Sequence, residues 1–128
     1  MTQEDKELLL KDLSARLPYG VRYRHIAWND ERGEEYIAAQ IYSINTDGYV
    51  KNCYDDETVY IDNVCPYLFP LFSMTEEQEK EYNDLNCYEL GCFPHTEDAL
   101  DYLIKNHFDF RCLISKGLAI DATGLNVY

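Results

Sequence analysis

The segment at residues 64–82 most constrains how this chain can fold, because its character changes in the middle. Its first half is apolar and aromatic and contains two prolines, which exclude a long helix there. From Thr75 the sequence turns acidic, and Thr75 stands three residues before Gln78, the spacing of a capping box. We therefore predict a helical turn and an extended apolar segment laid against a sheet, followed by a helix from about Thr75 to Leu85 or Tyr88.

An amphipathic helix is expected near the start of the chain, over residues 3–16. Thr2 is its candidate N-cap, with Asp5 three residues later. Pro18 ends it, because the residue before a proline is pushed out of the helical conformation. The apolar residues that recur at helical spacing, and that we expect to be buried, are Leu9, Leu10, Leu13 and Leu17.

The next part of the chain alternates between apolar and polar residues in four segments, as strands do. The segments are residues 19–28, 35–44, 49–53 and 58–61. In the first of them Val21, Tyr23 and His25 share one face. The turn at residues 45–48 has the composition of a hairpin, with Gly48 placed for a positive φ. Four strands joined by short turns predict an antiparallel meander.

The rest of the chain is expected to be mainly helical. A helix is predicted over residues 96–106, and a short one over residues 111–116. Residues 86–94 are expected to form a loop because they contain glycine and proline. The predicted fold class is therefore α+β: an N-terminal helix, a four-stranded antiparallel meander, and a helical C-terminal half packed on one sheet face. We expect a single domain over residues 1–128.

The charge of the chain narrows its range of partners. It has 24 acidic and 11 basic residues, which give a formal net charge of −13. Binding to a phosphate backbone needs a surface rich in Lys and Arg, so we expect neither direct nucleic-acid binding nor binding to an anionic membrane. The same charge is compatible with high solubility, with a basic protein partner, or with mimicry of nucleic acid.

The sequence favours a cytoplasmic location. Its first residues are acidic where a secretory signal is basic, and no apolar run approaches the roughly 18 residues that span a bilayer. The five cysteines are odd in number and irregularly spaced, which favours free thiols in a reducing compartment over a disulfide framework.

No motif assigns a catalytic, metal-binding or cofactor-binding residue. Cys87 and Cys92 have four residues between them, and a site that included His95 would lack a clear fourth zinc ligand. A cysteine nucleophile needs a histidine neighbour in space, which spacing in sequence does not show. Residues 107–111, His-Phe-Asp-Phe-Arg, allow a polar site. The reading we favour for them is that the phenylalanines anchor a helix end while the acid and the arginine pair or cap the backbone.

Tyrosine is the residue type that we weigh most, with twelve copies in the chain. Tyr joins a large apolar ring to a polar hydroxyl and is enriched in protein interfaces, although it also packs across strands in half-buried sheets. The residues of a possible interaction surface, all in or beside the predicted strands, are Tyr23, Tyr36, Tyr42, Tyr49 and Tyr60.

These features predict a small non-enzymatic cytosolic accessory or adaptor protein that acts through protein–protein contacts. The sequence does not identify its protein partner, and a basic protein is one option. Two alternatives stay open. One is an acidic nucleic-acid mimic that inhibits a DNA-binding protein, and the other is a small enzyme with a cysteine or histidine site.

Two segments stand out together: residues 66–77, Pro-Tyr-Leu-Phe-Pro-Leu-Phe-Ser-Met-Thr-Glu-Glu, and residues 107–120, His-Phe-Asp-Phe-Arg-Cys-Leu-Ile-Ser-Lys-Gly-Leu-Ala-Ile. Their pairing resembles a family of short uncharacterised proteins encoded in gut bacterial genomes, often in prophage or other mobile elements. Residues 17–21, Leu-Pro-Tyr-Gly-Val, extend the resemblance into the first half. Family members tend to have glycine in place of Cys112 and arginine in place of Phe69, which implies that neither position holds an invariant catalytic group. The resemblance implies a shared fold and an accessory role, and it brings no known activity.

Overall fold

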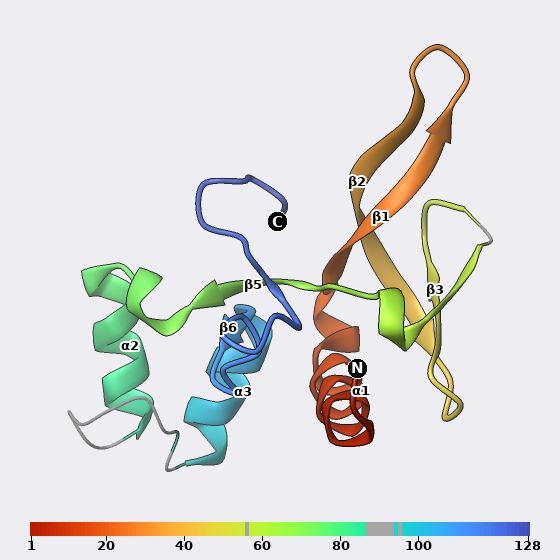
Figure 1. The fold of residues 1–128 in the computed structure, drawn as a ribbon. Helices are drawn as coiled ribbons and strands as arrows, with labels where there is room; N and C mark the ends of the chain where they lie inside the picture. The colour runs from red at the N-terminus through yellow and green to blue at the C-terminus, as the bar shows by residue number, and fades with distance from the viewer. Residues whose placement is uncertain (56, 87–93, 95) are drawn as a thin grey trace.

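The structure, a computed structural model, describes residues 1–55, 57–86, 94 and 96–128. In this part of the chain the elements, in order, are α1 (Gln3–Arg16), η1 (Leu17–Tyr19), β1 (Arg22–Asn29), β2 (Gly33–Ile44), β3 (Tyr49–Asn52), β4 (Thr58–Tyr60), η2 (Ile61–Asn63), β5 (Tyr67–Pro70), η3 (Leu71–Ser73), α2 (Glu76–Asn86), α3 (Glu97–Lys105), β6 (Phe108–Asp109) and β7 (Ile120–Asp121). The η elements are 3-10 helices. Among these ranges, no helix has both the length and the apolar character needed to cross a membrane. The β1–β2 hairpin projects from the body of the molecule, and α2 lies on the other side (Figure 1).

The first helix, α1, has the bounds and the cap that its sequence predicts. The Thr2 hydroxyl accepts a hydrogen bond from the Asp5 backbone N–H at 3.1 Å, and Leu9 and Leu13 are fully buried. The 3-10 helix η1 follows directly, and Gly20 comes after it with a φ of 73°. Glycine adopts this left-handed conformation at little cost, so the chain can turn from the helix into β1.

The predicted four-stranded antiparallel meander is confirmed, with the strand order β1-β2-β3-β4. The inward-facing, buried side chains of β1 are Tyr23, His25 and Ala27. The register of β2 against β3 shifts between Ile41 and Ser43, which marks a β-bulge. A hydrogen bond between strands that are not neighbours shows that the sheet is curled. The Tyr23 hydroxyl in β1 accepts it from Asn52 in β3, two strands away.

The apolar segment after β4 is extended, as predicted, but it belongs to a second sheet. β5 is the central strand of a small parallel sheet with the order β6-β5-β7. Phe69 of β5 pairs with Phe108 of β6, and Tyr67 pairs with Ile120 of β7. An isolated bridge from Pro66 to Tyr23 joins the start of this segment to the meander.

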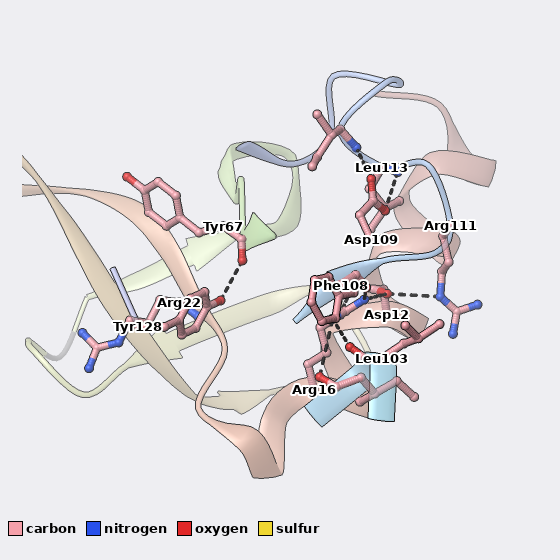
Figure 2. A network of polar contacts seen from close by, with 12 residues as sticks. Asp12, Arg16, Arg22, Tyr67, Leu103, Phe108, Asp109, Arg111, Leu113 and Tyr128 are labelled. Carbon is pink, nitrogen blue, oxygen red and sulfur yellow. Dashed lines mark hydrogen bonds and ion pairs between the residues drawn. The ribbon is translucent and has the colours of Figure 1, made fainter. Parts of the chain in front are cut away.

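The prediction of a helical C-terminal half is wrong beyond α3. Residues 111–116 form turns, because the Asp109 carboxylate accepts hydrogen bonds from the backbone N–H groups of Leu113 and the next residue, both at 2.9 Å (Figure 2). A side chain that binds these donors competes with a helix for them. His107 and Cys112 have positive φ values of 60° and 59°, and such left-handed residues interrupt a right-handed helix.

The two longer helices predicted in the second half are confirmed as α2 and α3. The Gln78 side chain accepts from the Thr75 N–H at 2.9 Å, and the Thr75 hydroxyl accepts from the Gln78 N–H at 3.1 Å. This is the predicted capping box. The Thr96 hydroxyl caps α3 by accepting from the Ala99 N–H at 3.0 Å. Most of the loop predicted at residues 86–94 lies outside the described residues.

The core of the described chain has two buried clusters, and Arg16 lies between them. One cluster packs α1 against the meander and β5, and the other joins α2, α3 and β6. The Arg16 guanidinium donates to the Asp12 carboxylate at 2.9 and 3.2 Å and to the Phe108 carbonyl at 2.6 Å. It also donates to the Leu103 carbonyl in the last turn of α3 at 3.4 Å. Arg111 donates to Asp12 from the other side, at 3.1 Å (Figure 2).

Replacing Arg16 with methionine should lower the free energy of unfolding by about 3–5 kcal/mol. The change leaves the buried Asp12 carboxylate with Arg111 as its remaining cation and removes the donor to α3 and β6. Urea denaturation measures the loss. The matched control is Arg32→Met in the exposed hairpin turn, for which we expect a change below about 0.5 kcal/mol. Equal effects of the two substitutions would contradict a central role for Arg16.

Candidate functional site

The edge of β1 that faces away from β2 is open over its second half. Alternate residues of an antiparallel strand direct their N–H and C=O groups to the same side. The Arg22 N–H donates to the Tyr128 hydroxyl, and the Arg24 N–H donates to the Cys65 carbonyl just before β5, both at 3.0 Å. The even-numbered residues therefore face away from β2, and beyond Arg24 these are Ile26 and Trp28. Within the described residues, no segment hydrogen-bonds to the main chain there.

The same part of the hairpin carries exposed apolar side chains. Ile26 and Tyr36 are register partners across β1 and β2, and Trp28 follows Ile26 on the same face. Trp28 is 69% exposed and Tyr36 is 66% exposed. The Arg24 guanidinium lies 5.1 Å from the centre of the Tyr36 ring, a cation–π distance. We call Arg24, Ile26, Trp28 and Tyr36 the outer patch.

The structure separates the five tyrosines of the predicted interaction surface. Tyr23 is fully buried, so it does not belong to an exposed contact surface. Tyr36 belongs to the outer patch, and Tyr42 is half-exposed further along β2. Tyr49 and Tyr60 are register partners in β3 and β4, with ring centres 5.3 Å apart. They form a separate aromatic pair beyond β2.

A hollow of about 320 Å³ lies beside the open edge of β1. Its lining includes residues of β1, β2 and β4 and of the segments that follow β3 and β4, among them Tyr23, His25, Tyr36, Glu57, Val59 and Cys65. Burial raises the pKa of the Cys65 thiol, with the nearby Arg24 charge opposing the rise. The nucleophilic thiolate is therefore disfavoured at this cysteine.

A closed ring of hydrogen bonds borders this hollow. Asn52 Nδ2 donates to Tyr23 Oη at 2.8 Å and to Asp55 Oδ1 at 3.2 Å. Because Tyr23 Oη accepts this bond, its own hydrogen is free to point to His25 Nδ1, 3.2 Å away. The proton of a neutral His25 then lies on Nε2 and is donated to Asp55 Oδ2 at 3.0 Å. The ring ties β1 to the turn between β3 and β4.

The charge at the ring is negative. Desolvation acts to raise the pKa of Asp55, but hydrogen bonds from His25, the Glu57 N–H and Asn52 outweigh it, and the pKa is lowered. Burial raises the pKa of Tyr23 against the opposing bond from Asn52. Near pH 7 Asp55 is therefore ionised and Tyr23 is neutral. His25, Asp55 and Glu57 together offer three possible metal-ligand atoms, all within 4.8 Å of one another.

The sequence alone assigned no functional role to His25 or Asn52. The signal that could have found them is their place in the strand alternation, because both occupy core-facing positions and a buried polar group needs a partner. Their pairing depends on the curl of the sheet, which has no local signal in the sequence. The residues considered for zinc, Cys87, Cys92 and His95, lie outside the described residues.

Residues 107–111 anchor the chain. The Asp109 carboxylate caps the turn that follows it, Arg111 pairs with Asp12, and Phe108 is buried in the second cluster. These contacts agree with the reading that we favoured for this segment.

His107 is buried in a left-handed conformation. Its Nε2 donates to the Tyr19 carbonyl at 3.0 Å, and its ring stacks on Tyr128 with ring centres 4.1 Å apart. Its Nδ1 has no hydrogen-bond partner among the described residues. Burial, reinforced by the Arg16 charge, lowers the pKa of His107 to about 4. His107 is therefore neutral near pH 7.

Comparisons with family models, with curated proteins and with solved structures gave no match to this chain.

Replacing Tyr23 with phenylalanine should lower the free energy of unfolding by about 1–3 kcal/mol, because the buried His25 Nδ1 loses its donor and Asn52 loses one acceptor. Chemical denaturation measures the change. Tyr42→Phe, which removes a hydroxyl from a half-exposed ring, serves as the control and should change stability by less than about 0.5 kcal/mol. A Tyr23→Phe variant as stable as this control would contradict the hydrogen-bond ring.

The stability of the protein should fall as the pH drops from about 6.5 toward 4, in part because His107 must take up a proton on unfolding. The pKa of His107 is lower in the folded protein than in the unfolded chain. Its contribution to stability is therefore complete above the unfolded pKa, and it is lost as the pH falls through the folded pKa. The shift from 6.5 to about 4 corresponds to about 3 kcal/mol. The His107→Asn variant, which tolerates the positive φ, should lose this part of the pH dependence. Parallel stability–pH profiles for the two proteins would exclude this role.

Proposed function

We propose that this protein binds an extended segment of a partner protein, which adds as a strand to the open edge of β1. The observation that carries the proposal is the main chain at Ile26 and Trp28, which has no partner among the described residues and lies beside the exposed side chains of the outer patch. The protein would thus act as an adaptor or accessory protein through a defined surface.

The main chain of β1 supplies the first part of the argument. An added strand would pair with the N–H and C=O groups of Ile26 and Trp28 and with the Arg24 carbonyl. Proteins usually protect such edges with proline, lysine, bulges or a covering segment. Residues 24–29, Arg-His-Ile-Ala-Trp-Asn, contain no proline or lysine, and their register with β2 is continuous. Within the described residues, this stretch of edge therefore has no proline, lysine or bulge to oppose strand pairing.

The side chains supply the second part, because they indicate what the partner segment looks like. Aromatic and arginine side chains are the residues that most often dominate binding energy at interfaces. The outer patch would contact alternate apolar side chains of the added strand. Near the hairpin turn, Trp28 Nε1 donates to Asp30 at 3.1 Å, and Glu34 is the register partner of Trp28. This acidic rim favours a basic residue at the corresponding end of the partner segment.

The expected affinity is modest. A short added strand covers less than a standard protein interface, so we expect a dissociation constant on the order of micromolar. The net charge of −13 would speed the approach of a basic segment and make its binding sensitive to salt.

No specific observation favours the two alternatives. Exposed acidic residues occur on α1, at the β1–β2 turn, on α2 and on α3, and the β1–β2 turn lies far from the three helices (Figure 1). A mimic of nucleic acid needs a continuous array of negative charge. If the protein were an enzyme, its substrate would have to bind in the hollow beside β1. The Cys65 thiol there is kept protonated by burial, which disfavours its use as a nucleophile.

Selection of a displayed library of random linear peptides against the purified protein tests the proposal. We expect binders with alternating apolar residues, and we expect a synthetic peptide of that sequence to slow hydrogen exchange at the Ile26 and Trp28 amides. The Ala27 amide should change less, because it already faces β2. Ile26→Pro, which removes an outward N–H that the sheet does not use, should abolish binding. Ile26→Thr keeps this N–H and should only weaken binding.

Two results would overturn the proposal. The first is peptide binding that persists in a folded Ile26→Pro variant, or protection confined to amides outside β1. The second is a dimer of the protein in sedimentation experiments that Ile26→Pro dissociates, since a second copy would then occupy the edge. Circular dichroism establishes that each variant is folded before binding is compared.

A further inference from the structure

We propose that His25, Asp55 and Glu57 bind a single Zn²⁺ ion at the hydrogen-bond ring beside β1. The ligand atoms would be His25 Nε2, Asp55 Oδ2 and Glu57 Oε2. His25 Nε2 lies 3.0 Å from Asp55 Oδ2 and 3.7 Å from Glu57 Oε2, and all three ligand atoms lie within 4.8 Å of one another. This inference rests on the inward-facing His25 side chain and on two side chains from the segment between β3 and β4, and not on the main chain at Ile26 and Trp28.

The spacing of these atoms suits tetrahedral coordination. With metal–ligand bonds of about 2.0–2.1 Å, neighbouring ligands of a tetrahedral ion lie roughly 3.3 Å apart. The two distances from His25 fall on either side of this value. The remaining spacing is the one between Asp55 Oδ2 and Glu57 Oε2. The Glu57 side chain is 70% exposed, so it can move the short distance that brings its carboxylate to the tetrahedral spacing. Asp55 needs little adjustment.

The surroundings hold the first two ligands in place. Asp55 Oδ1 accepts from Asn52 Nδ2 at 3.2 Å and from the Glu57 N–H at 3.0 Å, which leaves Oδ2 for the ion. On the other side of the imidazole, His25 Nδ1 lies 3.2 Å from Tyr23 Oη. Such second contacts orient metal ligands and raise affinity.

The ligand types favour zinc over the hard cations. Mg²⁺ and Ca²⁺ prefer sites made only of oxygen, whereas imidazole suits Zn²⁺ and its neighbours in the first transition row. Two carboxylates and a neutral imidazole also balance the charge of a divalent ion. Three protein ligands leave a fourth position for water, on an ion that lies beside the hollow.

Binding would change the hydrogen bonds of the ring in a defined way. The ion takes the position of the proton between His25 Nε2 and Asp55 Oδ2, so the ring proton of the neutral imidazole moves to Nδ1. Nδ1–H then donates to Tyr23 Oη, which already accepts from Asn52. The Tyr23 hydrogen has to turn away from the imidazole. This rearrangement has a cost, and it would make the affinity lower than that of a site formed by thiolates.

Calorimetric titration of the full chain with Zn²⁺, in a buffer and reductant that do not chelate metal, tests the site. We expect one ion per chain and an affinity that falls by at least about tenfold in His25→Gln and in Glu57→Gln. Glu57 is largely exposed, so its variant tests the site even if the His25 variant fails to fold. Glu4→Gln, which removes an exposed carboxylate on α1, is the matched control and should bind Zn²⁺ as the wild type does.

Substitution with Co²⁺ gives an independent readout, because its visible spectrum reports the ligands and their geometry. We expect the spectrum of a four- or five-coordinate nitrogen and oxygen site. A strong thiolate-to-metal band would overturn the proposal, because it would place the ion at a cysteine. No heat of binding, or equal affinity in the Glu57→Gln and Glu4→Gln variants, would overturn it as well.

Discussion

The buried guanidinium of Arg16 is the contact on which the rest of the structure depends. A cation is tolerated in a protein interior only when its charge is balanced and its donors have acceptors. Asp12, one turn earlier on α1, supplies the charge. The last turn of α3 supplies carbonyl groups at the negative end of its helix dipole. Because Arg16 also binds the Phe108 carbonyl, it positions β6 where β5 can pair with it.

The N-terminal half could be predicted well because its signals are local. A cap at Thr2, a proline after the helix and an Asn-Thr-Asp-Gly turn each act over a few residues. The region after α3 could not, because no local pattern marks a two-residue strand. Cys112 also adopts a positive φ although cysteine is not one of the residue types that favour this conformation. Only the surrounding contacts, such as the Asp109 cap, select these conformations.

The candidate site could be predicted only in part, for the same reason. Strand alternation together with the β1–β2 register places Tyr23 and Tyr36 on opposite faces, but it does not say which face the rest of the chain covers. That choice is made by α1 and β5, which pack with Tyr23 in the first cluster and leave Tyr36 outside. The approach of His25 to Asp55 depends in turn on the curl between β1 and β3, a property of the assembled sheet.

The central position of β5 has a consequence for the order in which the molecule folds. Each strand of the meander pairs with a neighbour in sequence, whereas β5 must wait for Phe108 and Ile120. Closing such long loops is entropically unfavourable, so these pairings form late. During synthesis, which proceeds from the N-terminus, α1 and the β1–β2 hairpin have the opportunity to assemble while β5 has no partners. The segment that covers β1 at Arg24 would then arrive after the hairpin has formed, and a nascent chain would expose a longer pairing edge than the finished protein does.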